Sequence, residues 1–385
     1  MLKIKSDKII TEKGLFDGFI YCKGNKIAEI SEKNAPCEEE YDFTGYYVSA
    51  GFIDLHTHGG GGFAFMDSSV QDVVNGCNFH MRHGTTTIVP TVSAGPFAAM
   101  RKAVDCIAQA MRSPETKTHI VGAHLEGPYL SAKQCGAQCP AFITPPVKEE
   151  YESLFKEFPT EIARWTYAPE QDRNGEFCKF VSSRGAVASM GHTDAVYEDV
   201  KTAMQNGCKL VTHLYSCTST VTRKNGFRSL GVIESTFLCD ELYAEIIADG
   251  KHLSPDLIRM ILKIKGKDKI ALITDSLSIA GTDIAEGVMS GTPFIVEDGV
   301  CKLKDRSAFA GSVATADRLV RVLVEDCGVS VEDAVHMITE VPARILGIRR
   351  GKIAAGFEAD FVVFDKKITV REVFADGKSC YSSKI

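Results

Sequence analysis

The sequence has no long uninterrupted hydrophobic run. No stretch approaches the roughly 18 consecutive apolar residues that a membrane span requires, and the start, MLKIKSDKII, lacks the apolar region of a secretory signal. We therefore expect a cytoplasmic protein without a membrane partner.

Paired cysteine motifs and a dominant charge are also missing. The 13 cysteines include no CxxC, and the closest two, Cys135 and Cys139, have no second cluster of Cys or His beside them. An odd number of scattered cysteines in an intracellular chain favours free thiols over a disulfide framework. Because the net charge of -6 comes from interspersed acidic and basic residues, we expect no nucleic-acid partner.

The composition does supply material for a large core. Hydrophobic residues make up 44% and charged residues 24% of the 385 positions, as in ordinary globular proteins. The length exceeds one typical domain of roughly 100 to 200 residues, although barrels often reach roughly 250 in one unit. We expect one large domain with a small one beside it.

Short runs rich in β-branched residues alternate with amphipathic helical patterns from residue 50 onward. The helical patterns end at glycines such as Gly185 and Gly207, which suit the left-handed position after a helix. Eight segments have the character of buried strands: GFIDLHTH (51–58), TTTIVPTV (85–92), HIVGAHLEG (119–127), ARWTYAPE (163–170), AVASMGHTD (186–194), KLVTHLYS (209–216), AEIIADG (244–250) and KIALITDS (269–276). Eight strand-helix units over roughly 300 residues predict an α/β fold, a (β/α)8 TIM barrel.

The two ends of the chain have a different pattern. Residues 1–49 and 347–385 alternate polar and apolar side chains around Gly and Asp turns, and neither segment is long enough to bury a core alone. We expect them to combine into a small β-sandwich domain beside a barrel of residues 50–346.

Ionisable side chains gather at the carboxyl ends of the expected strands. Because a strand has a period of two, His56 and His58 project from one face while Thr57 points away. The other strand ends carry Thr91, Glu126, Glu170, His192, His213, Asp249 and Asp275. In a barrel these ends meet at one rim, where active sites of this fold are built.

A carboxylate and two imidazoles from three strands, Glu126, His192 and His213, form the ligand set of a catalytic metal with an open position. His56 and His58 can hold a second ion, the alternative being an ordinary hydrogen-bonded pair. Such ligands accept zinc, iron, manganese or cobalt, of which we expect zinc.

Asp275 closes the rim from the eighth strand. A carboxylate beside a metal-bound water, whose pKa can fall to about 7, can accept its proton and deliver it to a leaving amine. The alternatives for Asp275 are a helix N-cap and a salt bridge at the rim.

At this point the sequence resembles a known family. The strings GFIDLHTHGG, HLEGPY, APE, GHTD, THLY, ADGKH, TDS and AGS occur in the order and spacing of N-acetylglucosamine-6-phosphate deacetylases, within the amidohydrolase superfamily, over nearly the whole chain. The resemblance implies hydrolysis of the acetamide of N-acetyl-D-glucosamine 6-phosphate to D-glucosamine 6-phosphate and acetate. It also implies one or two divalent ions per subunit and a homodimer whose subunits exchange a phosphate-binding group.

Transferred position by position, the resemblance implies these roles: metal ligation by Glu126, His192 and His213, a second ion at His56 and His58, acid/base catalysis by Asp275, substrate orientation by His252, and a sugar-side loop of Phe309, Ala310 and Gly311.

Two places depart from the family pattern. Where the family usually has GAHNP, Ala137 is followed by Gln138, which replaces a histidine that contacts the substrate. Where it usually has NAM after THLY, this chain has Ser216, Cys217 and Thr218, with an insertion before Arg228.

Phosphate binding is expected near the second departure. The backbone N–H groups of Ser216 and Cys217 can hold phosphate without a particular side chain. Arg228 is the preferred phosphate clamp because guanidinium binds phosphate oxygens in a fork, with Arg223 and Lys224 as alternatives.

Other functions remain open at this stage. One is a related hydrolase, such as an N-acetylgalactosamine-6-phosphate deacetylase or a cyclic-amide hydrolase, although the latter generally bridges its metals with a carboxylated lysine and this chain has Glu126 at that strand. Another is an inactive barrel that serves as a scaffold, although such a protein would be expected to lose its ligands first.

Overall fold

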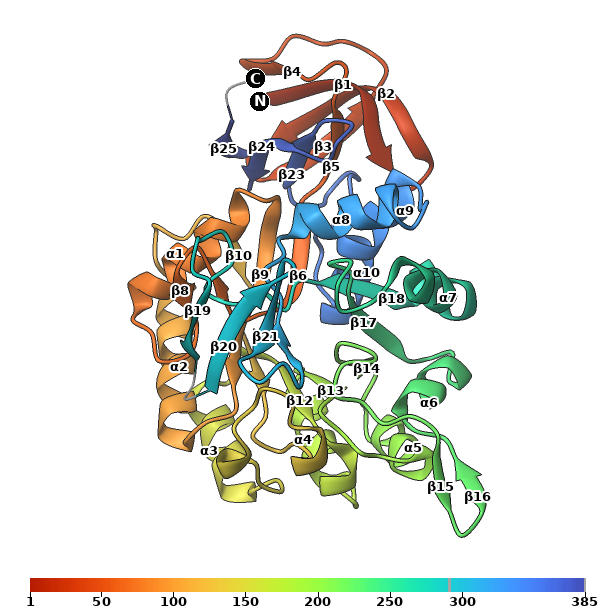
Figure 1. Cartoon of the computed structure of the whole chain (residues 1–385). Helices are drawn as coiled ribbons and strands as arrows, with labels where there is room; N and C mark the ends of the chain where they lie inside the picture. The colour runs from red at the N-terminus through yellow and green to blue at the C-terminus, as the bar shows by residue number, and fades with distance from the viewer. Residues whose placement is uncertain (290–291, 384–385) are drawn as a thin grey trace.

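The computed structural model describes residues 1–289 and 292–383, and it has an α/β architecture with two parts (Figure 1). All eight strands expected from the sequence are present. They are β6 (Phe52–Thr57), β9 (Thr85–Ser93), β10 (His119–Ile120) with β11 (Ala123–Glu126), β12 (Ile162–Tyr167), β13 (Val187–Met190), β14 (Leu210–Val211), β17 (Tyr243–Ile247) and β18 (Ile270–Ile273).

These strands pair in parallel and in chain order, from β6 and β9 through β11 to β18, which confirms the predicted barrel. A parallel bridge between Thr57 and Ser276 joins the first and last strands. Beside it, the His58 N–H donates to Ser276 O at 2.7 Å and the Asp275 N–H donates to His56 O at 2.9 Å. This seam therefore brings His56, His58 and Asp275 to one place.

Helices follow the strands and pack around the barrel (Figure 1). The α1 helix begins after Ser69, whose hydroxyl accepts a hydrogen bond from the Asp72 N–H. Gly185 and Gly207 follow α4 and α5 with φ of 82° and 103°, as the sequence predicts. No helix within the described ranges combines the length and hydrophobicity of a membrane span. The helices are α1 (Val70–Met81), α2 (Phe97–Ala110), α3 (Lys148–Glu157), α4 (Glu176–Ser183), α5 (Tyr197–Gln205), α6 (Val232–Leu238), α7 (Pro255–Lys265), α8 (Ala316–Glu325), α9 (Val331–Ile338) and α10 (Glu340–Leu346).

The two ends of the described chain form a separate β domain (Figure 1). Its strands are β1 (Leu2–Thr11), β2 (Gly14–Lys23), β3 (Lys26–Ser31), β4 (Glu39–Asp42), β5 (Tyr47–Ala50), β23 (Phe361–Phe364), β24 (Val370–Ala375) and β25 (Lys378–Ser382). One edge of β1 divides between β4 and β5, and the strands enclose a core that includes Ile4, Ile20 and Phe374. The antiparallel pairing of β5 with β23 joins the two ends of the chain, as expected.

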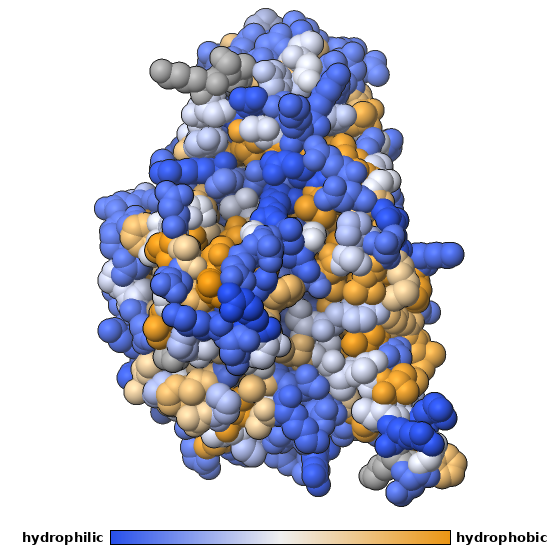
Figure 2. Space-filling model, viewed as in Figure 1, coloured by the Kyte–Doolittle hydropathy of each residue, from blue (hydrophilic) through white to orange (hydrophobic). Residues whose placement is uncertain are grey.

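Smaller elements lie outside the eight strand-helix units of the barrel. A four-stranded antiparallel sheet, β19 (Glu286–Met289), β20 (Thr292–Glu297), β21 (Val300–Leu303) and β22 (Phe309–Gly311), was not predicted from the sequence. The hairpin β15 (Thr222–Lys224) and β16 (Phe227–Ser229) stands clear of the body (Figures 1 and 2). The remaining short elements are β7 (Gly59–Gly60), β8 (Phe63–Ala64), η1 (Ala132–Gln134), η2 (Pro140–Phe142), η3 (Pro169–Gln171) and η4 (Lys267–Lys269).

Candidate metal centre and active site

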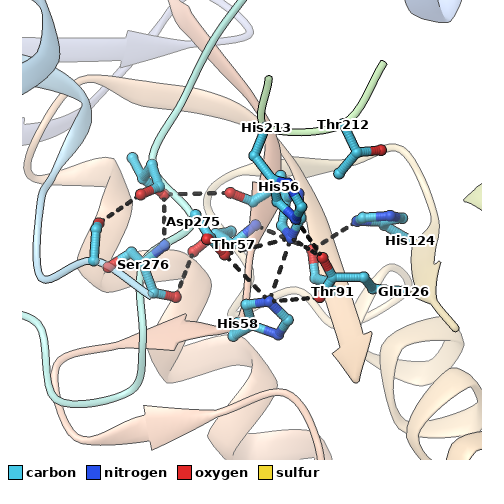
Figure 3. A network of polar contacts seen from close by, with 12 residues as sticks. His56, Thr57, His58, Thr91, His124, Glu126, Thr212, His213, Asp275 and Ser276 are labelled. Atoms are coloured by element: carbon cyan, nitrogen blue, oxygen red, sulfur yellow. Dashed lines mark hydrogen bonds and ion pairs between the residues drawn. The ribbon is translucent and has the colours of Figure 1, made fainter. Parts of the chain in front are cut away.

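Glu126 lies at the centre of a group of imidazoles at the carboxyl end of the barrel (Figure 3). Its Oε1 lies 3.1 Å from His192 Nε2 and 3.0 Å from His213 Nε2. His56 Nε2 lies 3.3 Å from the same oxygen, and His58 Nε2 lies 3.2 Å from Oε2. The structure thus brings together all five residues that the sequence suggested as metal ligands.

The donor atoms form two groups of three that share Glu126. One group consists of Glu126, His192 and His213, and the other of His56, His58 and Glu126, with the donor atoms of each group within 4.8 Å of one another. Each group therefore has the compactness that a single ion requires, and the carboxylate lies between them.

Hydrogen bonds on the far side of two rings determine which nitrogen faces Glu126. His192 Nδ1 lies 2.8 Å from Gln134 O, and His213 Nδ1 lies 3.0 Å from Ser216 O. Because a carbonyl only accepts, each Nδ1 carries the hydrogen, and each neutral ring presents an Nε2 lone pair to the carboxylate. Opposed lone pairs at this separation need a proton or a cation between them, so the donor set fits a divalent metal.

The electrostatics of the cluster favour positive charge. Burial raises the pKa of Glu126, but the neighbouring rings of His56 and His192, when protonated, lower it well below its usual value. Burial lowers the pKa of His56, but Glu126 and Asp275 overcome this effect and raise it to about 10. Buried carboxylates at such short distances from imidazole therefore stabilise a cation, whether proton or metal.

Backbone strain is concentrated at this site. Eleven non-glycine residues of the described ranges have a positive φ, and five of them line one cavity: His192 (47°), His213 (29°), Tyr215 (77°), Cys217 (51°) and Asp275 (47°). Such left-handed conformations cost about 1–3 kcal/mol each and persist where the surrounding structure imposes them. The strands end just before His192 and His213, and the turn in the backbone aims both rings inward.

Asp275 lines the cavity together with His58 and lies beside His56 and His58 (Figure 3). Its Oδ1 is 3.4 Å from His56 Nε2 and 3.3 Å from His58 Nε2. Its backbone is fixed at the barrel seam, where its carbonyl accepts from the Ser312 N–H at 2.9 Å. The carboxylate is thus held beside the candidate ligands and borders the space that a substrate can enter.

A cavity of about 270 Å³ opens at the metal ligands. Eight of the nine substrate-binding residues expected from the sequence line it: Ala137, Gln138, Ser216, Cys217, His252, Phe309, Ala310 and Gly311. The β22 strand supplies the last three, so the unpredicted small sheet forms one wall of the cavity.

Two of the expected substrate-binding residues, His252 and Arg228, lie in different surroundings. His252 borders it because Asp249 accepts from the backbone N–H groups of Lys251 and His252, both at 2.8 Å, and bonds His252 Nδ1 at 2.9 Å. Arg228, by contrast, lies exposed on β16 and does not line the cavity of its own chain.

Sequence reasoning missed several functional neighbours. Tyr215 lines the cavity, but as a neutral side chain it did not stand out among ionisable strand ends. Arg164 and Glu245 form a fully buried ion pair beneath the ligands. Glu245 Oε2 lies 3.8 Å from His56 Nδ1, and its place in the middle of a strand concealed this proximity.

Comparisons with known proteins agree with this geometry. The sequence profile of the amidohydrolase family matches residues 47–380. The N-acetylglucosamine-6-phosphate deacetylase of Lysinibacillus sphaericus is 28% identical over 93% of this chain and 92% of its own length. The N-acetylgalactosamine-6-phosphate deacetylase of a Shewanella species is 30% identical over 89% of this chain and 86% of its own length.

Solved structures give the same result. A mutant N-acetyl-D-glucosamine-6-phosphate deacetylase from Mycobacterium smegmatis, in complex with N-acetyl-D-glucosamine-6-phosphate, superposes with a TM-score of 0.92 at 27% identity, covering 99% of each chain. The N-acetylglucosamine-6-phosphate deacetylase from Pasteurella multocida also has a TM-score of 0.92 at 27% identity, covering 99% of this chain and 100% of that one. With a family profile that spans most of its length, the chain belongs to the amidohydrolase family.

Proposed function

We propose that the chain hydrolyses the acetamide of N-acetyl-D-glucosamine 6-phosphate and releases acetate and D-glucosamine 6-phosphate. The observation that carries the proposal is the convergence of Asp275 with Glu126 and its imidazoles at the wall of one cavity. The relatives and solved structures at 27–30% identity, which carry this activity in their names or a closely related one, support the choice of substrate.

The chemistry divides between a metal and the residues of the chain. A divalent ion at Glu126, His192 and His213 would polarise the acetamide carbonyl. It would also lower the pKa of the attacking water, so that this water loses a proton readily at neutral pH. Asp275 would accept the proton of the attacking water and donate it to the leaving amine nitrogen. Without that proton the amine is a poor leaving group, so Asp275 has a part in both bond formation and bond breaking.

The cavity residues would position the sugar. His252, held by Asp249, lies with its ring centroid 4.9 Å from that of Phe309, so the two rings form one side of the cavity. The Ser216 N–H donates to His213 O at 2.9 Å, so of the two backbone groups expected to bind phosphate the Cys217 N–H is the one proposed to bind the 6-phosphate. Together these contacts would fix the acetamide near Asp275.

A homodimer would complete the phosphate site. Arg228 lies on a hairpin that projects from its own subunit, a position from which it would reach the cavity of a partner (Figure 1). Sedimentation analysis tests the dimer, and a monomer with full activity would contradict it. The cytoplasmic location likewise stays a prediction, which cell fractionation tests.

The metal is proposed to be zinc, with a second and weaker ion at His56 and His58. Elemental analysis of protein purified without chelator should find at least one ion per chain. His56→Ala should reduce the content toward one ion, because the Glu126, His192 and His213 group stays complete. Unchanged metal content and turnover in His56→Ala would make the histidine pair structural.

One assay tests reaction and substrate together. Acetate release is measured with N-acetylglucosamine and N-acetylgalactosamine, each with and without a 6-phosphate. We expect the highest kcat/KM with N-acetyl-D-glucosamine 6-phosphate and a large loss without the phosphate. The 30% identical Shewanella relative makes the galactosamine compound the second candidate, and a higher kcat/KM with it would reassign the substrate.

A further inference from the structure

Gln138 contacts the carboxylate at the centre of the site. Its Nε2 donates to Glu126 Oε2 at 2.7 Å, while its Oε1 accepts from the Ala94 N–H at 3.0 Å. Because a backbone N–H can only donate, the Ala94 contact fixes the orientation of the amide and directs its NH2 group toward Glu126. The position that departs from the family pattern is therefore tied to the metal ligand.

The loop around Gln138 holds a second ligand as well. The carbonyl of Gln134 bonds His192 Nδ1 at 2.8 Å, and the Gln138 N–H donates to Cys135 O at 2.9 Å in a turn between them. One short segment thus orients both Glu126 and His192. Groups that hydrogen-bond to ligands in this way commonly set metal affinity.

The end of β9 orients both side chains that contact Glu126 Oε2, His58 and Gln138. Ser93 Oγ lies 3.0 Å from His58 Nδ1, and the adjacent Ala94 supplies the N–H that fixes Gln138. Both neighbours of Glu126 Oε2 are therefore oriented by consecutive residues. With Oε2 held by Gln138, Oε1 faces His192 and His213.

We infer that Gln138 is a positioning residue that fixes Glu126 for metal binding, in addition to lining the cavity. The inference rests on the proposed metal-dependent hydrolysis. One N–H hydrogen of the amide remains available to the cavity, so Gln138 can touch a substrate as well. A measurement made without substrate separates the two roles.

The test measures zinc affinity by competition with a chromogenic chelator, in protein first stripped of metal. Gln138→Leu keeps a similar size but removes the donor, and we expect its zinc dissociation constant to rise about 10- to 100-fold. Gln138→Met removes the donor with a different side-chain shape and should show the same rise. Gln134→Leu is the matched control, because its contact to His192 is made by the backbone carbonyl.

Each outcome decides between the roles. Unchanged zinc affinity in both Gln138 variants, with a raised KM, would overturn the inference and make Gln138 a substrate contact only. The same rise in Gln134→Leu would also overturn it, since the loop rather than the amide would then be responsible. A wild-type chain without zinc affinity would overturn the proposed function too.

Discussion

Replacing Asp275 with asparagine separates proton transfer from folding and metal binding. Asparagine keeps the size of the side chain but cannot carry the transferred proton. The backbone hydrogen bonds of Asp275 to His56 and Ser312 remain, so the barrel seam stays closed. Within the described residues the side chain forms ion pairs with His56 and His58, at 3.4 and 3.3 Å, and none with His192 or His213, so we expect the ligand group that contains His192 to stay intact.

The magnitude follows from the role of the group. General acid/base catalysis is typically worth about 10² to 10⁴ in rate, or about 3–5 kcal/mol in the barrier. We therefore expect Asp275→Asn to lose at least about 10² in kcat. Its KM should change by less than about tenfold, because the cavity contacts to the sugar remain, and a tenfold change corresponds to about 1.4 kcal/mol.

The assay combines acetate release at saturating substrate with metal analysis and thermal unfolding of the same preparation. Asp17→Asn is the control, because Asp17 is an exposed residue of the β domain, whereas the site lies in the barrel. Near wild-type turnover in a metal-replete Asp275→Asn protein would refute the reasoning and leave His252 as the next candidate. A folded protein without metal would instead assign Asp275 to metal retention.

Three other substitutions test the fold and the dimer. Arg164→Met leaves Glu245 buried without its partner, so urea unfolding should show a loss of about 3–5 kcal/mol, and a loss below about 1 kcal/mol would contradict this. The carboxylates of Glu340, at 3.6 Å, and Asp268, at 2.8 Å, raise the pKa of His336 above 6.5, so His336→Gln should destabilise by about 0.5–1 kcal/mol below that pH. That difference should disappear as the pH rises through the folded-state pKa, and a pH-independent loss would exclude the ion pair. Arg228→Ala should mainly raise KM, whereas an equal fall of kcat and kcat/KM at constant KM would indicate a transition-state role.

The barrel and the convergence of the candidate ligands could be predicted from the sequence for a physical reason. A strand that ends in a parallel barrel delivers its last residues to one rim, so His56, Glu126 and His213 could be grouped without knowing the contacts between them. The apolar runs that precede them are buried in the structure, as their composition predicts.

Other features depend on contacts between segments that the sequence does not pair. Histidine adopts a positive φ more readily than most residues, but no pattern in the sequence marks His192 and His213 as left-handed, and the surrounding fold imposes that backbone. The bond between Gln138 and Glu126 joins a loop to a strand, and only its departure from the family pattern marked it. The position of Arg228 outside its own cavity depends on the extent of the hairpin, which the insertion did not define.

The shared β domain also constrains how the protein is made. During synthesis β5 emerges early, but its antiparallel partner β23 begins only at Phe361, more than 300 residues later. Until then β5 presents an unpaired edge that another nascent chain could join. We expect the barrel to assemble before β23 is available, so ribosome-bound chains that end before β23 should be protease-sensitive within residues 1–50 although their barrel is protected.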